Sequence, residues 1–284
     1  SGCDLRLQVG DREFLDAGLG LADQIVDRSS HAGDGSPRAQ AHEVRGGGCR
    51  PQTLTMAPPA GISIAGARAL VVGATGGLGS AITERLVAGG ARVVTSGRRE
   101  LAGVGATLHV ECDITVSAER ERLIDDTIGA LDGIDIVVIA SGVVGFAPAT
   151  VMRAADIAHL IAVDLAAPLA LLGEVAPAVE DGGAIAVITG AIVDTPIPAT
   201  STYAAAKAGL SSACVVVRRE LRPRRINVID ARPPHTETGL ADRAVFGSAP
   251  TFPTGLSPSV VAERIVRGIA DGESELTPSA FGAA

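Results

Sequence analysis

The sequence predicts an α/β protein built on a doubly wound parallel sheet. Two observations predict this fold. Short runs rich in Val and Ile alternate with helical stretches from Ile64 onward, and a glycine-rich turn follows the first of these runs. Successive parallel strands need crossover connections, which are right-handed and place helices on both faces of the sheet. We therefore expect a buried sheet between two layers of helices.

Each expected strand is a short apolar run, and each expected helix is a longer stretch with apolar residues at helical spacing. The expected strands are Ala69–Val72, Arg92–Thr95, Thr107–Val110, Asp135–Ala140, Ala184–Thr189 and Asn227–Asp230. The expected helices are Leu78–Ala88, Ala118–Leu131, Ala154–Ala178, Thr202–Leu221 and Pro258–Ala270, followed by a short tail with weak strand character.

The chain divides near residue 60 into an extension and a single domain. Residues 29–59 are polar, rich in Gly, Pro and Ser, and lack a period of 2 or 3.6, which is typical of a linker or a disordered segment. The first 28 residues have no assignable role. We expect residues 1–58 to be an extension or linker with partial disorder, and residues 59–284 to be one dinucleotide-binding catalytic domain.

Composition excludes several classes of protein. The chain has 284 residues, 46% of them hydrophobic, with a net charge of −8 and 2% aromatic residues. A hydrophobic share of this size suffices for a buried core, whereas the acidic balance and scarce aromatic residues argue against nucleic-acid binding. No uninterrupted apolar run reaches the roughly 18–20 residues of a membrane span. We expect neither a nucleic-acid nor a membrane partner.

Cysteine usage and the start of the chain favour a reducing compartment. Cys3, Cys49, Cys112 and Cys214 are scattered, with no CxxC pair and no His at ligand spacing. Free thiols are therefore expected, and no metal site is predicted. The chain opens without a charged-then-apolar signal segment. These observations favour a cytoplasmic protein.

The glycine-rich turn joins the first expected strand to the first expected helix. Gly73, Gly77, Leu78 and Gly79 lie in this turn. Glycines allow the backbone to approach a pyrophosphate closely, and the helix N-terminus supplies N–H donors and a positive dipole end. The turn is thus a candidate dinucleotide site, with an ordinary strand-to-helix turn as the alternative.

The end of the second expected strand favours NADP over NAD. An acidic residue at this position would accept a hydrogen bond from the ribose 2′-hydroxyl of NAD, but the chain has Gly97 followed by Arg98. A guanidinium without a carboxylate suits a 2′-phosphate. The alternative is that Arg98 and Arg99 form a solvated pair with no role in binding.

Tyr203 and Lys207 form the strongest signal in the sequence. They are the single Tyr and the single Lys of the chain, although the chain has 24 basic residues. Their spacing of four places both side chains on one face of a helix. An ammonium beside a phenol lowers the phenol pKa, which makes Tyr203 a candidate acid and base near neutral pH.

Together these motifs resemble those of the short-chain dehydrogenase/reductase family, over residues 64 to about 275. The GxxxGxG spacing and the YxxxK pair carry the resemblance, with Val72 where the family usually has Thr. The resemblance implies a Rossmann-like fold, Tyr203 as catalytic acid/base, and Lys207 as a ligand of the nicotinamide ribose.

The resemblance also implies further cofactor contacts. Asp113 matches the Asp that caps the adenine pocket, and Gly142 matches the last residue of the family's NNAG segment. The segment from Pro233 to Thr238, with Thr236 between them, is similar to the PGxxxT segment that holds the nicotinamide carboxamide. The alternative for this segment is a structural turn.

Three further parts of the family pattern differ in this chain. NNAG is replaced by Ile-Ala-Ser-Gly, the helix Asn by Asp164, and the substrate-orienting Ser by Gly190. Thr189 or Ser141 could supply the missing hydroxyl, and Thr189 is included among the catalytic candidates for this reason.

The sequence therefore predicts an NADP(H)-dependent oxidoreductase that transfers a hydride between the nicotinamide and a small-molecule carbonyl or alcohol. The small residues on the helix from Tyr203 to Ala213 suit close packing between subunits, so we expect a homodimer or homotetramer, and the resemblance favours the tetramer. The alternative function is a non-catalytic NADP-binding sensor or scaffold of the same fold, which Asp164 and Gly190 favour.

Overall fold

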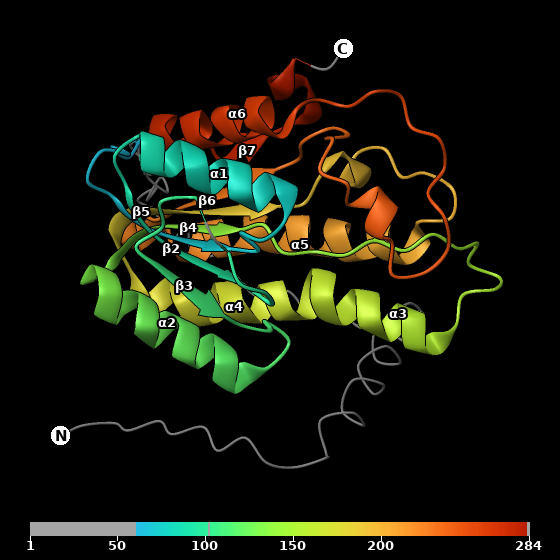
Figure 1. Cartoon of the computed structure of the whole chain (residues 1–284), viewed down its shortest axis with the longest axis horizontal. Coiled ribbons are helices and arrows are strands. Elements are labelled where there is room, and N and C mark those ends of the chain that lie inside the picture. Colours follow the sequence, from blue (N-terminus) through green and yellow to red (C-terminus); the bar gives the residue numbers. More distant parts are fainter. Residues whose placement is uncertain (1–60, 102, 283–284) are drawn as a thin grey trace, which may run out of the picture. The chain divides into compact units, whose positions relative to one another are not determined.

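The computed structural model describes residues 61–101 and 103–282. In this part of the chain, seven strands form one parallel sheet in the order β3-β2-β1-β4-β5-β6-β7 (Figure 1). The strands are β1 (Arg68–Val72), β2 (Arg92–Gly97), β3 (Leu108–Glu111), β4 (Ile134–Ile139), β5 (Val179–Ile188), β6 (Asn227–Ala231) and β7 (Glu275–Leu276). The predicted fold class is confirmed. The expected extension, residues 1–58, lies outside the described residues.

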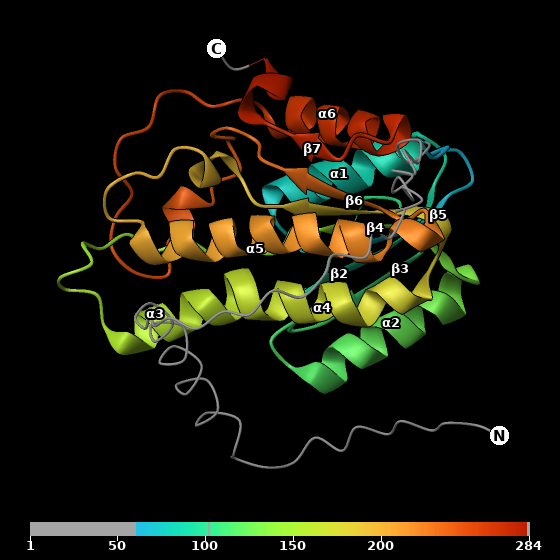
Figure 2. The same ribbon diagram turned by 180° about the vertical axis from the view of Figure 1, so that it is seen from behind.

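Helices cover both faces of the sheet (Figures 1 and 2). The helices are α1 (Gly77–Ala88), α2 (Ser117–Leu131), α3 (Ala154–Ile161), α4 (Ala167–Val175), α5 (Ser201–Glu220) and α6 (Pro258–Asp271). A π-helical turn, η2 (Ala162–Ala166), joins α3 to α4. Short 3₁₀ turns are η3 (Ala176–Ala178), η4 (Ala191–Val193), η5 (Arg222–Arg224), η6 (Ala241–Arg243) and η7 (Pro278–Phe281).

Two apolar clusters form the core, one on each face of the sheet. One cluster joins the sheet to α1 and α6 through residues such as Ile82 and Ile265. The other joins it to α2, α4 and α5 through residues such as Leu123, Leu171 and Leu210. Both faces of the sheet are therefore buried, which is why its strands read as continuous apolar runs rather than as alternating ones.

The expected helix Ala154–Ala178 is interrupted in the structure. Pro168 lacks the N–H that would donate to the carbonyl of Asp164 four residues earlier. The hydrogen bonds of the helix span one more residue at this point: the Ala167 N–H donates to the carbonyl of Ala162, five residues earlier. The strand β5 likewise begins at Val179 rather than at Ala184.

Residues 154–178 are also long and apolar enough to pass a length-and-composition criterion for a membrane span, with mean hydropathy 1.7. In this fold, Leu160, Leu171, Leu172 and Val175 of this stretch are fully buried in the domain core. The core helix of an α/β domain satisfies the same criterion, so the criterion alone does not indicate a membrane span.

The strand order reverses direction between β1 and β4. The chain runs from β1 outward to β2 and β3, then returns to place β4 on the other side of β1. The connections that leave the carboxyl ends of β1 and β4 therefore go to opposite sides and leave a crevice between them. In open α/β sheets ligands bind at such a crevice.

Candidate active site

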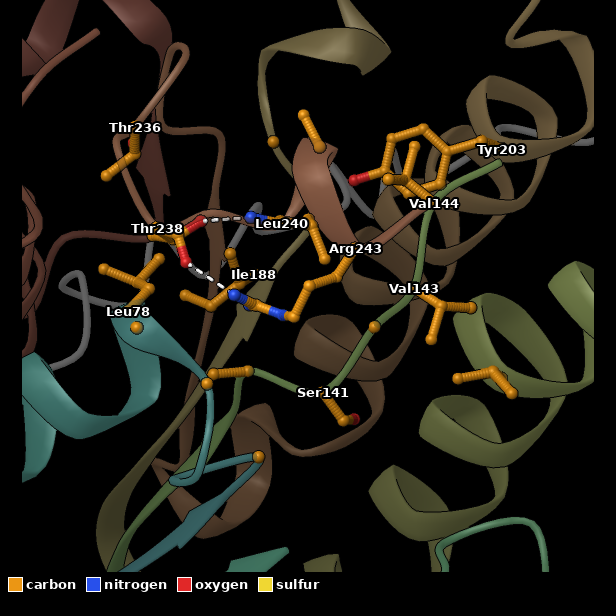
Figure 3. Close-up of a pocket in the computed structure, with 18 of the residues that line it drawn as sticks. Leu78, Ser141, Val143, Val144, Ile188, Tyr203, Thr236, Thr238, Leu240 and Arg243 are labelled. Carbon is orange, nitrogen blue, oxygen red and sulfur yellow. Dashed lines mark hydrogen bonds between the residues drawn. The ribbon is translucent and has the colours of Figure 1, made fainter. Parts of the chain in front are cut away.

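A cavity of about 1180 Å³ lies at the carboxyl ends of the strands. Its wall is formed by the β1–α1 turn, the ends of β2, β4 and β5, the first turns of α5 and the long segment after β6 (Figure 3). The wall includes all the residues that the sequence predicted for the catalytic and cofactor sites. Residues far apart in the chain thus line one space.

The glycines of the β1–α1 turn are required by close backbone contacts. Gly73 has φ +85°, and a Cβ on it would lie 2.6 Å from the backbone nitrogen of Ser141. A Cβ on Gly77 would lie 3.0 Å from Cα of Thr238, so the turn packs directly on the segment after β6. No side chain caps the N-terminus of α1. This backbone cradle with free N–H donors is suited to a diphosphate.

The ends of β2 and β3 form the opposite part of the cavity. A Cβ on Gly97 would lie 2.6 Å from Oγ1 of Thr75, so the Thr75 side chain fills the space beside this glycine. Arg98 is exposed and lines the cavity. Asp113 Oδ1 accepts hydrogen bonds from the backbone N–H and the hydroxyl of Thr115, at 2.9 and 2.7 Å. These bonds fix the Asp113 carboxylate and lower its pKa.

Tyr203 and Lys207 lie one turn apart near the start of α5. The phenol of Tyr203 points toward the cavity interior beside Val144 (Figure 3). The Lys207 ammonium lies 5.9 Å from the centroid of the Tyr203 ring. It donates a hydrogen bond to the carbonyl of Ile188, at 3.3 Å, and lies 3.4 Å from Oδ1 of Asp164. The predicted pair is therefore on one helix face, with a carboxylate against it.

That carboxylate changes the electrostatics expected from the sequence. We expected Lys207 to lower the pKa of Tyr203, but the structure raises it, first because the phenol is buried and then because of the charge on Asp164. Asp164 is itself fully buried. The expectation was wrong because it considered the helix pair alone, without the residue that η2 brings to it.

Gly142 permits this close packing. A Cβ at this position would lie 2.8 Å from Oδ1 of Asp164 and 3.2 Å from the Lys207 ammonium. Any larger residue would therefore separate the two charged groups from the segment after β4. This close packing explains why position 142 requires glycine, the one residue that this segment shares with the family's NNAG.

Thr189 lines the cavity, but its hydroxyl proton is directed away from it. Thr189 Oγ1 donates to Oδ1 of Asp230, at 2.5 Å, and the second Asp230 oxygen accepts from Ser211. Asp230 was missed by the sequence reasoning; the signal was an acidic residue inside an apolar strand. The other hydroxyl candidate, Ser141, has a buried Oγ without a hydrogen-bond partner among the described residues.

The segment after β6 contributes Pro233, Thr236 and Thr238 to the cavity wall. Thr236 donates its hydroxyl to the carbonyl of Pro234, at 2.8 Å. The carbonyl of Thr238 accepts a hydrogen bond from the Arg243 guanidinium, at 3.2 Å, which extends into the same space (Figure 3). Arg243 belongs to no motif, so sequence reasoning did not select it.

Two phenylalanines add an aromatic surface to the cavity wall. Phe146 and Phe252 line it, with ring centroids 6.4 Å apart. His235 stacks on Phe252, with ring centroids 4.7 Å apart. Sequence reasoning did not select either Phe. The available signal was that the chain has only five Phe residues. In the described part of the chain, no group of three or more His, Cys, Asp or Glu side chains could hold a metal ion.

The doubly wound sheet, the glycine cradle and the Tyr–Lys pair define an oxidoreductase fold that takes a nicotinamide dinucleotide. Residues 67–245, more than half of the chain, match the family model described as short chain dehydrogenase. The chain belongs to this family.

Curated relatives agree with this assignment. "Uncharacterized oxidoreductase DltE" of Bacillus subtilis is 25% identical over 219 residues, which cover 73% of this chain and 86% of that protein. "Cyclic-di-GMP-binding biofilm dispersal mediator protein" of Escherichia coli is 30% identical over 187 residues, or 62% of this chain and 77% of that protein.

Solved structures share the fold. A dehydrogenase/reductase from Sinorhizobium meliloti superposes with a TM-score of 0.66 at 25% identity, covering 77% of this chain and 97% of the other. A 3-ketoacyl-(acyl-carrier-protein) reductase from Brucella melitensis, complexed with NADH, gives a TM-score of 0.68 at 22% identity, covering 76% and 96%.

Proposed function

We propose that this protein transfers a hydride between NADP(H) and a carbonyl or alcohol, with Tyr203 exchanging the proton. The observation that carries the proposal is the geometry of the single phenol in the chain: it points into the cavity, one turn from the buried single Lys. A binding protein without turnover has no use for a proton donor at this position.

The residues around the cavity fit a dinucleotide. The cradle of Gly73 and Gly77 leaves space that a Cβ would fill, and the buried, unpartnered Oγ of Ser141 is a donor on the same wall. A bound nicotinamide supplies or accepts the hydride. Lys207 would bind its ribose, Thr236 and Thr238 would hold its carboxamide, and Asp113 would close the adenine end.

Tyr203 would donate its proton to the substrate oxygen during carbonyl reduction and accept one during alcohol oxidation. Proton transfer by such a positioned group contributes about 10²–10⁴-fold to a rate. Thr189 stays a candidate for orienting the substrate oxygen, provided that its hydroxyl turns away from Asp230. The apolar wall of Phe146 and Phe252 would exclude water from the reacting atoms.

The preference for NADP rests on the space beside Gly97. Thr75 fills the position that an acidic side chain would need, and the exposed Arg98 guanidinium is available to a 2′-phosphate. NADPH should therefore raise the melting temperature more than NADH at equal concentration, since a tenfold preference corresponds to about 1.4 kcal/mol at saturating ligand.

Arg98→Ala should reduce the difference between the melting-temperature shifts that NADPH and NADH produce. Arg219→Ala, which removes an exposed arginine outside the cavity wall, should leave that difference unchanged. Equal shifts with both cofactors would contradict the NADP preference. Intact NADPH binding without turnover on any ketone would favour the alternative, a non-catalytic sensor or scaffold. The presence of Asp164 in place of the family's Asn, and of Gly190 in place of its Ser, supports that alternative.

We also propose a homodimer or homotetramer in the cytoplasm. Leu169 of α4 and Val215 and Val216 of α5 are 40%, 38% and 49% exposed, and both helices lie on the same face of the sheet (Figure 2). Exposed apolar side chains on neighbouring helices suit burial against a second copy. A monomeric mass by light scattering would contradict the oligomer, and secretion into the culture medium would contradict the location.

A further inference from the structure

A buried carboxylate lies against the ammonium of the candidate catalytic pair. Asp164 is 0% exposed and Lys207 is 4% exposed. Asp164 Oδ1 accepts a hydrogen bond from the backbone N–H of Val143, at 3.2 Å, and lies 3.4 Å from the Lys207 ammonium. Asp164 Oδ2 has no partner among the described residues.

The position of Asp164 is set by the helix interruption. Asp164 lies in the π-helical turn η2, and Pro168, just beyond this turn, withholds the N–H that would donate to the Asp164 carbonyl. Widened turns of this kind occur often at functional sites. The backbone that carries this acidic residue thus departs from a regular helix where it meets α5.

The charged groups around this pair are few. Lys207 and Tyr203 face Asp164 from α5, and His159 acts on it from α3. The segment after β4 and the end of β5 present neutral backbone groups to the pair, the Val143 N–H and the Ile188 carbonyl. Cys214 lies farther along α5, next to Asp230. Asp164 is therefore the group that balances the charge of Lys207.

Charge balance has a direct consequence for the phenol. An ammonium alone favours phenolate, whereas an ammonium paired with a carboxylate has no net charge. Burial raises the pKa of Asp164, and the Lys207 ammonium and the Val143 N–H oppose that rise. While the two side chains share one proton, the pair is neutral whether that proton resides on Lys207 or on Asp164. Desolvation of the phenol then disfavours the phenolate and raises the pKa of Tyr203.

We propose that Asp164 is a positioning residue that neutralises Lys207, so that Tyr203 stays protonated at neutral pH and the site works chiefly as a carbonyl reductase. The inference rests on the proposed function. In the step itself, bound NADPH would supply the hydride and become NADP⁺, and the carbonyl carbon would gain a C–H bond as the C=O π electrons move to the oxygen. The Tyr203 O–H bond breaks, and its proton passes to the carbonyl oxygen. The phenolate then recovers a proton from solvent.

The reverse reaction needs phenolate as the base that removes the alcohol proton. A neutral Lys207–Asp164 pair makes phenolate scarce at neutral pH, so alcohol oxidation should rise with pH into the alkaline range. Reduction needs only the phenol, which is abundant. The overall equilibrium is unchanged, because the protein alters rates in both directions; what Asp164 sets is the pH at which each direction runs.

Asp164→Asn tests this directly. Asn keeps the size of the side chain and an oxygen for the Val143 N–H, but removes the charge. The midpoint of the pH profile for alcohol oxidation with NADP⁺ should fall by at least about one unit, which means an oxidation rate about tenfold higher at pH 7. The ketone reduction rate at pH 7 should change much less.

The phenol can also be titrated without any turnover. The chain has one Tyr and no Trp, so the near-ultraviolet absorbance of phenolate reports Tyr203 alone. Its midpoint should lie above about 10 in the wild type and fall in Asp164→Asn. This titration needs no substrate. If the protein had no activity on any ketone, the proposed function would be overturned, but the titration would still test the effect of Asp164 on Tyr203.

Asp156→Asn is the matched control. Asp156 lies on α3, pairs with the exposed Arg153 and lies outside the cavity wall, so it makes the same charge change away from the site. It should leave both profiles unchanged. Unchanged profiles in a folded Asp164→Asn variant would overturn the inference. If that variant does not fold, a wild-type Tyr203 midpoint below about 10, the ordinary value of a phenol, would overturn it equally.

Discussion

Gly190 occupies a backbone conformation that is almost confined to glycine. Its φ is +90° and its ψ is 159°, although a Cβ would meet nothing within 4 Å. An L-amino acid such as the family's substrate-orienting Ser would be strained in this conformation. We expect both Gly190→Ala and Gly190→Ser to lower the free energy of unfolding by about 1–3 kcal/mol, measured by urea denaturation.

The two variants serve as controls for each other. They share the backbone strain, so the ratio of their turnover numbers on a ketone isolates the contribution of the hydroxyl. A Gly190→Ser variant as stable as the wild type would contradict the strain argument. It would mean that the loop relaxes to an ordinary conformation and can present a serine as other family members do.

At the scale of residues, sequence reasoning worked where chemistry depends on a local pattern. The Tyr203–Lys207 pair and the glycines of the first turn are defined by spacing within one element, and the structure brings them to one cavity. Reasoning failed for the pKa of Tyr203, because Asp164 lies about forty residues earlier and its contact depends on tertiary packing. It also missed Arg243, which follows no motif.

At the scale of elements, the sequence predicted the strands and helices but not their irregularities. Helical periodicity continues through residues 154–178, and only Pro168 signals the π-helical turn within them. A proline inside a helix predicts an interruption, but the packing of α4 on the sheet decides whether the result is a kink or a widened turn. The sequence therefore could not place the Asp164 side chain.

Arg218 of α5 forms hydrogen bonds to the backbone near the β7 edge of the sheet. Arg218 Nε donates to the carbonyl of Val228 in β6, at 2.6 Å, and its Nη2 donates to the carbonyl of Ser274 before β7, at 2.5 Å. The strand β7 is only two residues long, so side-chain bonds matter at this edge. Arg218→Met should lower the free energy of unfolding by about 1–3 kcal/mol, because it leaves buried carbonyls without this donor.

The neighbouring Arg219 provides the control for this prediction. It is exposed and belongs to the same helix turn, so Arg219→Met makes the same chemical change without removing these bonds. Its free energy of unfolding should stay within about 0.5 kcal/mol of the wild type. Equal losses for the two variants would mean that helix propensity or surface charge, rather than the bonds to the sheet edge, controls stability here.

At the scale of the whole molecule, the reversal of strand order decides where the site lies. The order could be expected from alternating strands and helices, because crossovers in one direction bury only one face of the sheet. The cavity follows from it, since residues after β1, β4, β5 and β6 meet at one edge. The shape of the substrate end depends on the long segment after β6, whose sequence has no period, so it could not be derived.

The stability of the protein at alkaline pH depends on a thiol buried in the core. Cys214 is fully buried in the apolar cluster shared by α2, α4 and α5, and burial, with a smaller effect of Asp230, raises its pKa to about 12 from the ordinary 9.0. A raised pKa means that folding favours the protonated thiol. This stabilisation is complete below about pH 9 and is lost as the pH rises toward 12, because the unfolded chain ionises first.

We therefore expect the free energy of unfolding to fall above pH 9, with Cys214 contributing up to about 1.4 kcal/mol per pH unit. Cys214→Ala should make the decline shallower by that amount, measured by urea denaturation between pH 7 and 11 in the presence of a reducing agent. Val217→Ala, which removes apolar contact from the same helix without removing a proton, should lower stability equally at every pH. The pH slope thus separates proton release from loss of packing. An unchanged slope in Cys214→Ala would mean that the thiol ionises in the folded protein as readily as in the unfolded chain, which would require water to reach the core beneath α5.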